Sequence, residues 1–211
     1  MEQSQNTTPM AEIVYREGLP RQLLPDAARL YDQAFGAKLG VAVPDRRRRV
    51  ALVRAGLQPE FGLAAVSGQR LVGLAGVHSR DGSLTGGITM RLMLAHLGLL
   101  GCARAAAVLQ LYDREPAPDE LVMDGVAVDA TCRSQGVGGR LLDEVAGYAR
   151  ARGLGRVRLD VIDSNPRARR LYERKGFVEV RHESYPLLGR LLGFSGASTM
   201  ELRIGAADRR G

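Results

Sequence analysis

The chain has 211 residues, of which 45% are hydrophobic and 25% are charged. Such a length and composition suit one globular domain, or one domain with an insertion, and they exclude a chain that is disordered throughout. The net charge of +7 favours anionic partners such as phosphorylated cofactors. We expect no nucleic-acid partner, because the densest basic run, residues 46–49, spreads around a helix and has no flanking aromatic side chains to stack on bases.

The first half of the chain predicts one strand, two helices and a hairpin. Residues 1–10 are expected to form a disordered tail, without the basic and apolar regions of a secretory signal, and residues 11–16 a strand. Apolar residues recur at helical spacing over 27–35, and a second, Arg-rich helix is expected from Pro44-Asp45 to about Gly56. Apolar runs at 61–66 and 71–78, separated by Ser67-Gly68-Gln69, predict a β-hairpin.

The second half alternates between strand and helix. Strands are expected at 121–128 and 156–162, helices at 137–151 and 166–175, and two further strands at 177–183 and 199–204, before a tail at 206–211. This alternation predicts at least one pair of parallel strands joined by a crossover helix.

Residues 84–113 form an apolar insertion between the third and fourth expected strands. About twenty of these residues are mostly apolar, so a membrane-spanning helix has to be weighed. Charged residues such as Arg91 and Arg104 fall within it, and Gly98 and Gly101 weaken a long helix. We therefore expect a soluble amphipathic helix, broken near Gly101, that forms a lid over the acceptor site or a homodimer contact. We expect no membrane association; the alternative is a membrane-surface or oligomerising protein driven by this insertion.

The two cysteines, Cys102 and Cys132, have no metal-ligand spacing. The sequence therefore predicts no disulfide framework and no bound metal, and it indicates a cytoplasmic protein.

A strand followed by a Gly-rich turn and a helix predicts a phosphate site. After the strand that ends at Val128, the turn brings Arg133, Gly136, Gly138 and Gly139 to the start of the helix. The first amides of a helix have no intrahelical acceptor, and the helix dipole adds positive charge there, so a diphosphate is favoured. The turn lacks the Lys-Ser/Thr of a P-loop and the third glycine of a dinucleotide fingerprint, and a plain strand-to-helix turn remains the alternative.

The spacing Arg133-x-x-Gly136-x-Gly138 resembles the Arg/Gln-x-x-Gly-x-Gly/Ala signature of the GNAT superfamily of N-acetyltransferases. About thirty residues later, Asn165-Pro166, Ala168, Leu171-Tyr172-Glu173 and Lys175-Gly176-Phe177 are similar to the second cofactor segment of that family. The resemblance is strong over residues 121–180, is only topological over 11–80, and fails at the insertion, where the family usually has a short connection.

The resemblance implies an α/β fold: a mixed, strongly twisted sheet of about six or seven strands flanked by helices, in a single domain over residues 11–205. Two parallel strands, 121–128 and 156–162, would splay apart around the pantetheine of acetyl-CoA, and a bulge would interrupt the first of them. The implied activity is direct transfer of an acetyl group, in a ternary complex, to a primary amine on a small molecule or a peptide. The alternative is a catalytically idle module that binds and senses acyl-CoA.

The same resemblance assigns residues to roles. Tyr172 would be the general acid for the departing thiolate, with core packing as its other interpretation, and Asn165 would contact the pantetheine, cap a helix, or do both. Asp124 is the candidate general base and Glu120 the second choice, because strand alternation places Asp124 on the face of Val126 and Val128. The expected cofactor-binding residues are Val126, Ala127, Val128, Arg133, Ser134, Gln135, Gly136, Val137, Gly138, Gly139, Asn165, Arg169 and Tyr172.

Overall fold

The computed structural model describes residues 12–109, 115–184 and 195–205. The expected tails, 1–10 and 206–211, lie outside these ranges. The strands are β1 (Ile13–Glu17), β2 (Gly62–Ser67), β3 (Arg70–Ser79), β4 (Gly82–Ser83), β5 (Glu120–Val128), β6 (Arg156–Ile162), β7 (Val178–Ser184) and β8 (Gly196–Arg203). The α-helices are α1 (Leu24–Ala42), α2 (Arg46–Gly56), α3 (Met90–Leu109), α4 (Val137–Ala151) and α5 (Pro166–Arg174), and the short 3-10 helices are η1 (Arg21–Leu23), η2 (Pro59–Phe61) and η3 (Ala130–Cys132).

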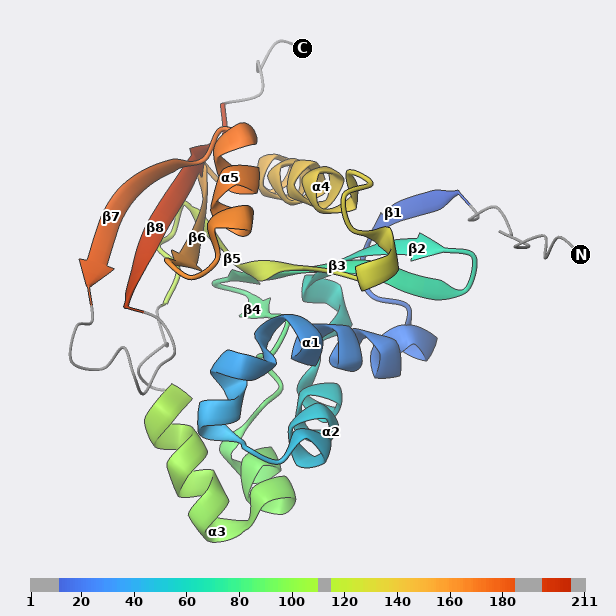
Figure 1. Ribbon diagram of the computed structural model, residues 1–211, viewed down its shortest axis with the longest axis vertical. Helices are drawn as coiled ribbons and strands as arrows, with labels where there is room; N and C mark the ends of the chain where they lie inside the picture. Colours follow the sequence, from blue (N-terminus) through green and yellow to red (C-terminus); the bar gives the residue numbers. More distant parts are fainter. Residues whose placement is uncertain (1–11, 110–114, 185–194, 206–211) are drawn as a thin grey trace, which may run out of the picture.

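The strands form one mixed sheet in the order β1-β2-β3-β5-β6-β8-β7, with the two-residue β4 paired to β3 (Figure 1). Only β5 and β6 are parallel, and α4 is the crossover between them. The remaining pairs are antiparallel. The predicted α/β architecture with a mixed sheet is confirmed; the sheet has eight strands, counting the two-residue β4, where about six or seven were expected, and α3 follows β4.

Helices pack against both faces of the sheet. On one face, α4 buries an apolar stripe at helical spacing that includes Leu141, Val145 and Tyr148, and this stripe joins the largest core cluster. On the other face, α1 buries Ala27, Leu30 and Tyr31 against β2 and β3. The sheet therefore separates two apolar cores, and the loops at its edges are positioned from both sides.

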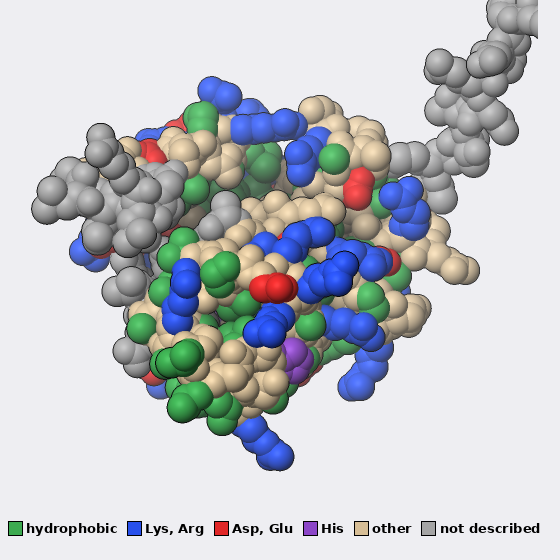
Figure 2. Space-filling model, turned by 60° about the horizontal axis from the view of Figure 1, so that its bottom comes forward, with side chains coloured by type: hydrophobic (Ala, Val, Ile, Leu, Met, Phe, Trp, Pro, Cys, Tyr) green, Lys and Arg blue, Asp and Glu red, His purple; other side chains and the backbone are tan. Residues whose placement is uncertain are grey.

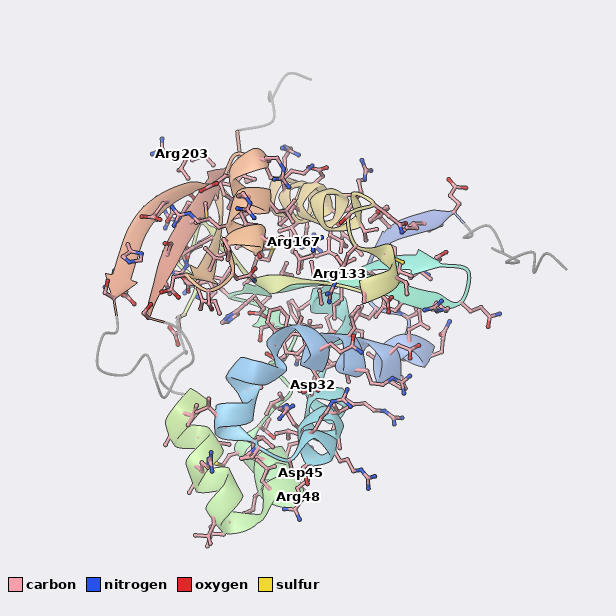
Figure 3. All side chains as sticks on the ribbon, in the orientation of Figure 1. Asp32, Asp45, Arg48, Arg133, Arg167 and Arg203 are labelled. Atoms are coloured by element: carbon pink, nitrogen blue, oxygen red, sulfur yellow. The ribbon has the colours of Figure 1, made fainter. Side chains whose placement is uncertain are left out.

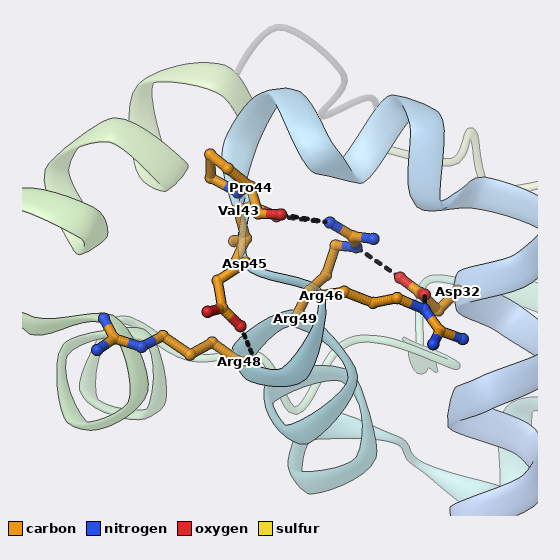
Figure 4. A network of polar contacts seen from close by, with 7 residues as sticks. All are labelled: Asp32, Val43, Pro44, Asp45, Arg46, Arg48 and Arg49. Carbon is orange, nitrogen blue, oxygen red and sulfur yellow. Dashed lines mark hydrogen bonds and ion pairs between the residues drawn. The ribbon is translucent and has the colours of Figure 1, made fainter.

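Helix α1 runs further than the periodicity predicted, from Leu24 through Gly36 and Gly40 to Ala42. These glycines serve packing: a Cβ at Gly36 would lie 3.1 Å from Oδ1 of Asp32 and 3.2 Å from a terminal nitrogen of Arg49. The Arg49 Nε donates to Asp32 at 2.5 Å, and an Arg49 terminal nitrogen donates to the carbonyl of Val43 at 2.8 Å (Figure 4). Glycine lets this buried ion pair approach the helix backbone.

The run of four arginines spreads around α2, as expected. Arg49 is buried and pairs with Asp32, while Arg46, Arg47 and Arg48 are exposed and point in different directions around the helix. The Arg46 Nε still reaches Asp32, at 3.0 Å. The helix begins at an N-cap, Asp45, whose carboxylate accepts from the Arg48 amide at 2.8 Å.

The insertion forms α3, which lies below α1 and α2 at the end of the molecule remote from α4 and α5 (Figure 1). Its break is at Gly98, three residues before the position expected, where φ is 70° and ψ is 179°. A side chain would strain this left-handed conformation, so glycine is required there, whereas Gly101 keeps helical geometry. Met93, Cys102 and Ala105 pack α3 against Ala42 and Leu52 of the two preceding helices.

Candidate functional site

A gap opens between β5 and β6. The parallel ladder covers only three residue pairs, from Glu120 opposite Arg156 to Val122 opposite Arg158. Beyond this point β5 continues to Val128 on the β3 side and β6 continues to Ile162 on the β8 side. Within the described residues, the part of β5 after Val122 therefore has no ladder partner on its β6 side, and the predicted splay is confirmed.

Glu120 sits at the closed end of this gap in a buried ionic cluster. Its Oε1 accepts from the Arg156 Nε at 3.1 Å, and its Oε2 lies 3.7 Å from an Arg158 nitrogen and accepts from the Ala117 amide at 3.2 Å. These contacts bind the strands together where the sheet is continuous. The structure thus gives the second-choice base a structural role.

A β-bulge interrupts β5 at Asp124. Gly76 on β3 is opposite Gly125 and Val77 is opposite Met123, so Asp124 is the extra residue on β5. Gly125 adopts φ 142°, which the backbone needs to resume pairing after the bulge. The bulge that the resemblance implied is present.

The bulge overturns the alternation argument for Asp124. Val126 and Val128 face α4, where they would lie 3.9 Å and 3.6 Å from a Cβ at Gly138. The Asp124 carboxylate is on the opposite face: it would lie 3.3 Å from a Cβ at Gly76, and its charge helps to raise the pKa of Tyr31 on α1. One inserted residue reverses the alternation of side chains, so Asp124 does not share a face with Val126 and Val128.

The turn after β5 is held by its own side chains. Asp129 caps η3 by accepting from the Thr131 amide at 2.9 Å, and bonds from Thr131 hold the pKa of this carboxyl below its usual value. The Arg133 Nε donates to the carbonyl of Val128 at 3.2 Å, and the side-chain amide Nε2 of Gln135 donates to the carbonyl of Thr131 at 2.9 Å. The exposed side chains of Arg133 and Gln135 therefore hold the turn in shape.

Two left-handed residues, Ser134 with φ 65° and Gly136 with φ 81°, lead into α4. No side chain caps α4, and the Arg140 amide, which donates to the carbonyl of Gly136 at 3.0 Å, is the first in the helical ladder. The amides of residues 137–139 precede it and have no intrahelical acceptor. A Cβ at Gly136 would meet nothing within 4 Å. We call residues 134–139 the cradle; its first helical amides lie at the positive end of the helix.

Gly138 and Gly139 allow α5 to pack closely. A Cβ at Gly138 would lie 3.3 Å from Leu171, and one at Gly139 would lie 3.1 Å from Lys175. Lys175 also pairs with Asp143, at 2.7 Å. These two glycines bring the second cofactor segment against the first.

The start of α5 confirms the N-cap interpretation of Asn165, whose Oδ1 accepts from the Ala168 amide at 3.1 Å, with Pro166 as the first helical residue. Arg169 faces away from the cradle. Its guanidinium donates to Ser198 at 3.2 Å and pairs with Glu173 at 3.0 Å and Glu179 at 2.8 Å. The geometry gives no support to a cofactor role for Arg169.

Arg167, which the sequence reasoning missed, reaches the cradle instead. A terminal nitrogen of Arg167 donates to the Ser134 hydroxyl at 3.0 Å, and Figure 3 shows Arg167 and Arg133 on the same part of the molecule, far from Asp45 and Arg48. The signal was available: Arg167, Leu171 and Lys175 recur every four residues, so they share the helix face that meets α4.

Tyr172 is 7% exposed and packs in the core beside Phe177, with ring centroids 5.9 Å apart. Burial raises the pKa of Tyr172 to about 12. The phenol therefore stays protonated at neutral pH, so it can donate a hydrogen bond or a proton but does not act as a base. Its core packing is confirmed, and this leaves a donor role available.

The comparisons with known proteins agree with this geometry. The family model described as the acetyltransferase (GNAT) family matches residues 24–177. No curated protein matched the sequence. In the described part of the chain, no group of three or more His, Cys, Asp or Glu residues is placed to hold a metal ion.

Solved structures of acetyltransferases are similar in fold. An N-acetyltransferase from Staphylococcus aureus Mu50 has a TM-score of 0.61 at 14% identity, covering 92% of this chain and 100% of that one. The ribosomal-protein-S18-alanine N-acetyltransferase from Escherichia coli has a TM-score of 0.55 at 18% identity, covering 95% and 99%. Ard1 from Thermoplasma volcanium has a TM-score of 0.56 at 18% identity, covering 92% and 98%.

Proposed function

This chain belongs to the GNAT acetyltransferase family and is an acyltransferase, and from that premise we propose that it transfers an acetyl group from acetyl-CoA directly to a primary amine. The observation that carries the proposal is the uncapped N-terminus of α4, open at Gly136, beside the gap between β5 and β6. A coenzyme with a diphosphate at one end and an extended thioester arm at the other fits both features.

The cradle supplies the groups that a diphosphate requires. Three helix amides, at residues 137–139, precede the helical ladder, and the exposed guanidinium groups of Arg133 and Arg167 flank the turn. Amides at a helix N-terminus together with arginines are a favoured environment for phosphate oxygens. We therefore assign the diphosphate to the cradle, with Arg167 taking the position first given to Arg169.

The outer edge of β5 would hold the thioester arm. The backbone of residues 123–128 that faces β6 lies outside the parallel ladder, so its amides can donate to an extended arm. Acetyl-CoA would supply the activated acetyl group. A hydrogen bond from the backbone amide of Val126 or Val128 to the thioester carbonyl would stabilise the negative charge that develops on its oxygen during attack.

Asp124 is the proposed general base. The attacking amine is protonated at neutral pH and has to lose a proton before it becomes a nucleophile. Asp124 is the residue displaced at the bulge, beside the gap, on the face covered by α1. We propose that the amine approaches from the α1 side while the coenzyme is held from the α4 side.

Tyr172 is the proposed donor to the leaving thiolate. A phenol with a pKa near 12 is a weaker acid than a thiol with a pKa near 8.5, so complete proton transfer would be uphill. Donation of a hydrogen bond to the departing sulfur gives stabilisation without that cost. The benefit of Tyr172 should accordingly be moderate.

A screen for CoA thiol release tests the activity. Purified chain is mixed with acetyl-CoA and a panel of primary amines: polyamines, aminoglycosides, amino acids and a peptide that begins with alanine, since the Escherichia coli relative is an alanine N-acetyltransferase by its name. We expect amine-dependent thiol release with at least one acceptor and formation of the N-acetyl product. Binding of CoA without thiol release across the panel would favour an idle acyl-CoA sensor.

We also propose that the protein works in the cytoplasm, where acetyl-CoA is made available and thiols stay reduced. Cys102 and Cys132 are buried and are not joined in a disulfide, which suits that compartment.

A further inference from the structure

Helix α3 presents large apolar side chains to solvent directly after its break. Leu99 is 76% exposed and Leu100 is 88% exposed. Met90 and Leu94, on the first half of the helix, are also exposed. In the described part of the chain, residues 90–108 are the one helical segment long and apolar enough to cross a membrane, and only 17% of that segment is buried.

These leucines do not cover the candidate site. The break at Gly98 interrupts the helix at the end of the molecule below α1 and α2, whereas the cradle lies beside α4 and α5 on the other side of the sheet (Figures 1 and 3). The described contacts of α3 are with α1 and α2. A lid over the coenzyme is therefore not the role of these side chains, and the expected lid over the acceptor site stays a prediction.

Two arginines line the same hollow as Leu100. A hollow of about 280 Å³ beside the break is lined by Leu97, Leu100, Arg48 and Arg104, together with Asp45. Arg104 donates to the carbonyl of Val41, which fixes its position, and the Asp45 carboxylate is committed to capping α2. Because Arg48 and Arg104 carry two positive charges and Asp45 carries one negative charge, the lining of the hollow has a net positive charge.

The charge excess extends over both helices. Helices α2 and α3 contain no Asp or Glu, and their basic residues are Arg46, Arg47, Arg48, Arg49, Arg54, Arg91 and Arg104. Only Arg49 is buried. In the view of Figure 2, Lys and Arg side chains and apolar side chains intermingle over the helical end, and acidic side chains are sparse.

From this juxtaposition we propose that Leu99 and Leu100, together with the exposed arginines Arg47, Arg48 and Arg104 of α2 and α3, form a docking surface for an anionic lipid bilayer. We call these five residues the leucine–arginine surface. Exposed leucines would enter the boundary between headgroups and acyl chains while the arginines contact lipid phosphates. This proposal favours the membrane-surface alternative over the expectation of no membrane association, because the insertion leaves Leu99 and Leu100 exposed.

The helix geometry favours docking on the surface over crossing the bilayer. The break at Gly98 leaves helical segments of eight and eleven residues. At about 1.5 Å per residue these span roughly 12 and 16 Å, well short of a hydrocarbon core of about 30 Å. Backbone groups freed at a break would also lack partners in lipid.

A second copy of the chain and a nucleic acid fit this surface less well. In a two-fold dimer the same arginine-rich helices would meet, and Asp45, the carboxylate of the hollow, is committed to capping α2, so like charges would repel. A nucleic acid would match the arginines but would leave Leu99 and Leu100 exposed, and the described parts of α2 and α3 contain no aromatic side chain to stack on bases.

Vesicle flotation tests the proposal. The full chain is mixed with vesicles of phosphatidylcholine alone or of phosphatidylcholine with phosphatidylglycerol, and the bound fraction is measured. We expect the chain to bind vesicles that contain phosphatidylglycerol at least about tenfold more strongly than vesicles of phosphatidylcholine alone. We expect this binding to weaken as the salt concentration rises. Leu99→Ser/Leu100→Ser and Arg47→Glu/Arg48→Glu should each weaken that binding by about tenfold or more.

Matched controls separate this surface from general effects of charge and hydrophobicity. Arg16→Glu/Arg203→Glu makes the same charge change on exposed strand residues; Arg203 lies at the opposite end of the molecule from Arg48 (Figure 3). Val178→Ser/Val180→Ser removes exposed apolar side chains from β7. Both controls should bind anionic vesicles like the wild type, and calorimetry with CoA should give the same affinity for every variant.

Several outcomes would overturn the proposal. Wild-type chain that remains unbound with anionic vesicles would do so, as would equal losses in the control variants. A dimer in light scattering that Leu99→Ser/Leu100→Ser dissociates, without vesicle binding, would assign the surface to a second copy. Binding to duplex RNA without binding to vesicles would assign it to nucleic acid.

Discussion

Arg167 and Arg169 lie two positions apart on α5, and their roles differ for that reason. A separation of about 200° around the helix sends one guanidinium to Ser134 and the other to Glu173 and Glu179. We predict that Arg167→Ala weakens CoA binding roughly tenfold, the effect of one charge-assisted bond, and that Arg169→Ala leaves it nearly unchanged. Titration calorimetry measures both, and equal losses would contradict the placement of the two side chains.

Asp124 offers a kinetic test at the same scale. Replacing it with Asn removes the proposed base while keeping the size of the side chain, so kcat/KM should fall by about a hundredfold or more. The rise in rate with pH on the acid side of the wild-type profile should also disappear. Asp81→Asn, a change at an exposed carboxylate outside the site, is the control. An unchanged pH–rate profile in Asp124→Asn would exclude Asp124 as the base.

Tyr172 should leave a signature in alkaline stability. Its pKa is raised by burial from 10.0 to about 12, so the folded state keeps a proton that the unfolded state loses above pH 10. The contribution is complete below pH 10 and is lost as the pH rises through about 12, which amounts to roughly 2–3 kcal/mol. Urea unfolding of the wild type should therefore show a steeper loss of stability over this range than Tyr172→Phe. Parallel pH dependence in the two proteins would show that burial does not shift this phenol.

The buried ion pair between α1 and α2 decides how these helices are joined. Asp32 is the carboxylate partner of both Arg49 and Arg46, and Arg49 also holds the chain between the helices through Val43 (Figure 4). Asp32→Ala would leave the largely buried Arg49 uncompensated, at a cost of about 3–5 kcal/mol in the free energy of unfolding.

A double variant separates the ion pair from simple packing. Asp32→Leu/Arg49→Met fills the same region with apolar atoms and leaves no unpaired buried charge, so it should cost less than Asp32→Ala. Chemical denaturation gives both values. A double variant that is less stable than Asp32→Ala would contradict the explanation by charge.

The elements that the sequence predicted well are those with local signals. Helix α4 begins at Val137 and α5 is capped by Asn165 because the Gly-rich turn and the Asn-Pro pair act within a few residues. Helix α1 continues past its apolar period, and two glycines that both weaken a helix did not show that the break would fall at Gly98 and not at Gly101.

The candidate site shows the same division. The cradle could be found from spacing alone, whereas the bulge at Asp124 inserts a residue that alternation cannot reveal and so misplaced the carboxylate by one face. The choice between Arg167 and Arg169 required knowing which side of α5 meets α4.

For the whole molecule, strand order brings the two halves of the site together. Because α4 connects the neighbouring parallel strands β5 and β6, its N-terminus lies at the end of β5, where the gap opens. The helices α1, α2 and α3 lie on the other face and carry the leucine–arginine surface away from the coenzyme. The coenzyme and the docking surface would thus lie on separate faces of one sheet.

The central claim is that the amides of the cradle, which have no intrahelical acceptor, bind a diphosphate. Calorimetry that compares CoA with acetylpantetheine tests this claim most directly. Acetylpantetheine keeps the arm that would lie in the gap but lacks the diphosphate. Two or three charge-assisted bonds predict that CoA binds at least roughly a hundredfold more tightly. No heat with CoA, or equal affinity for the two ligands, would contradict the account.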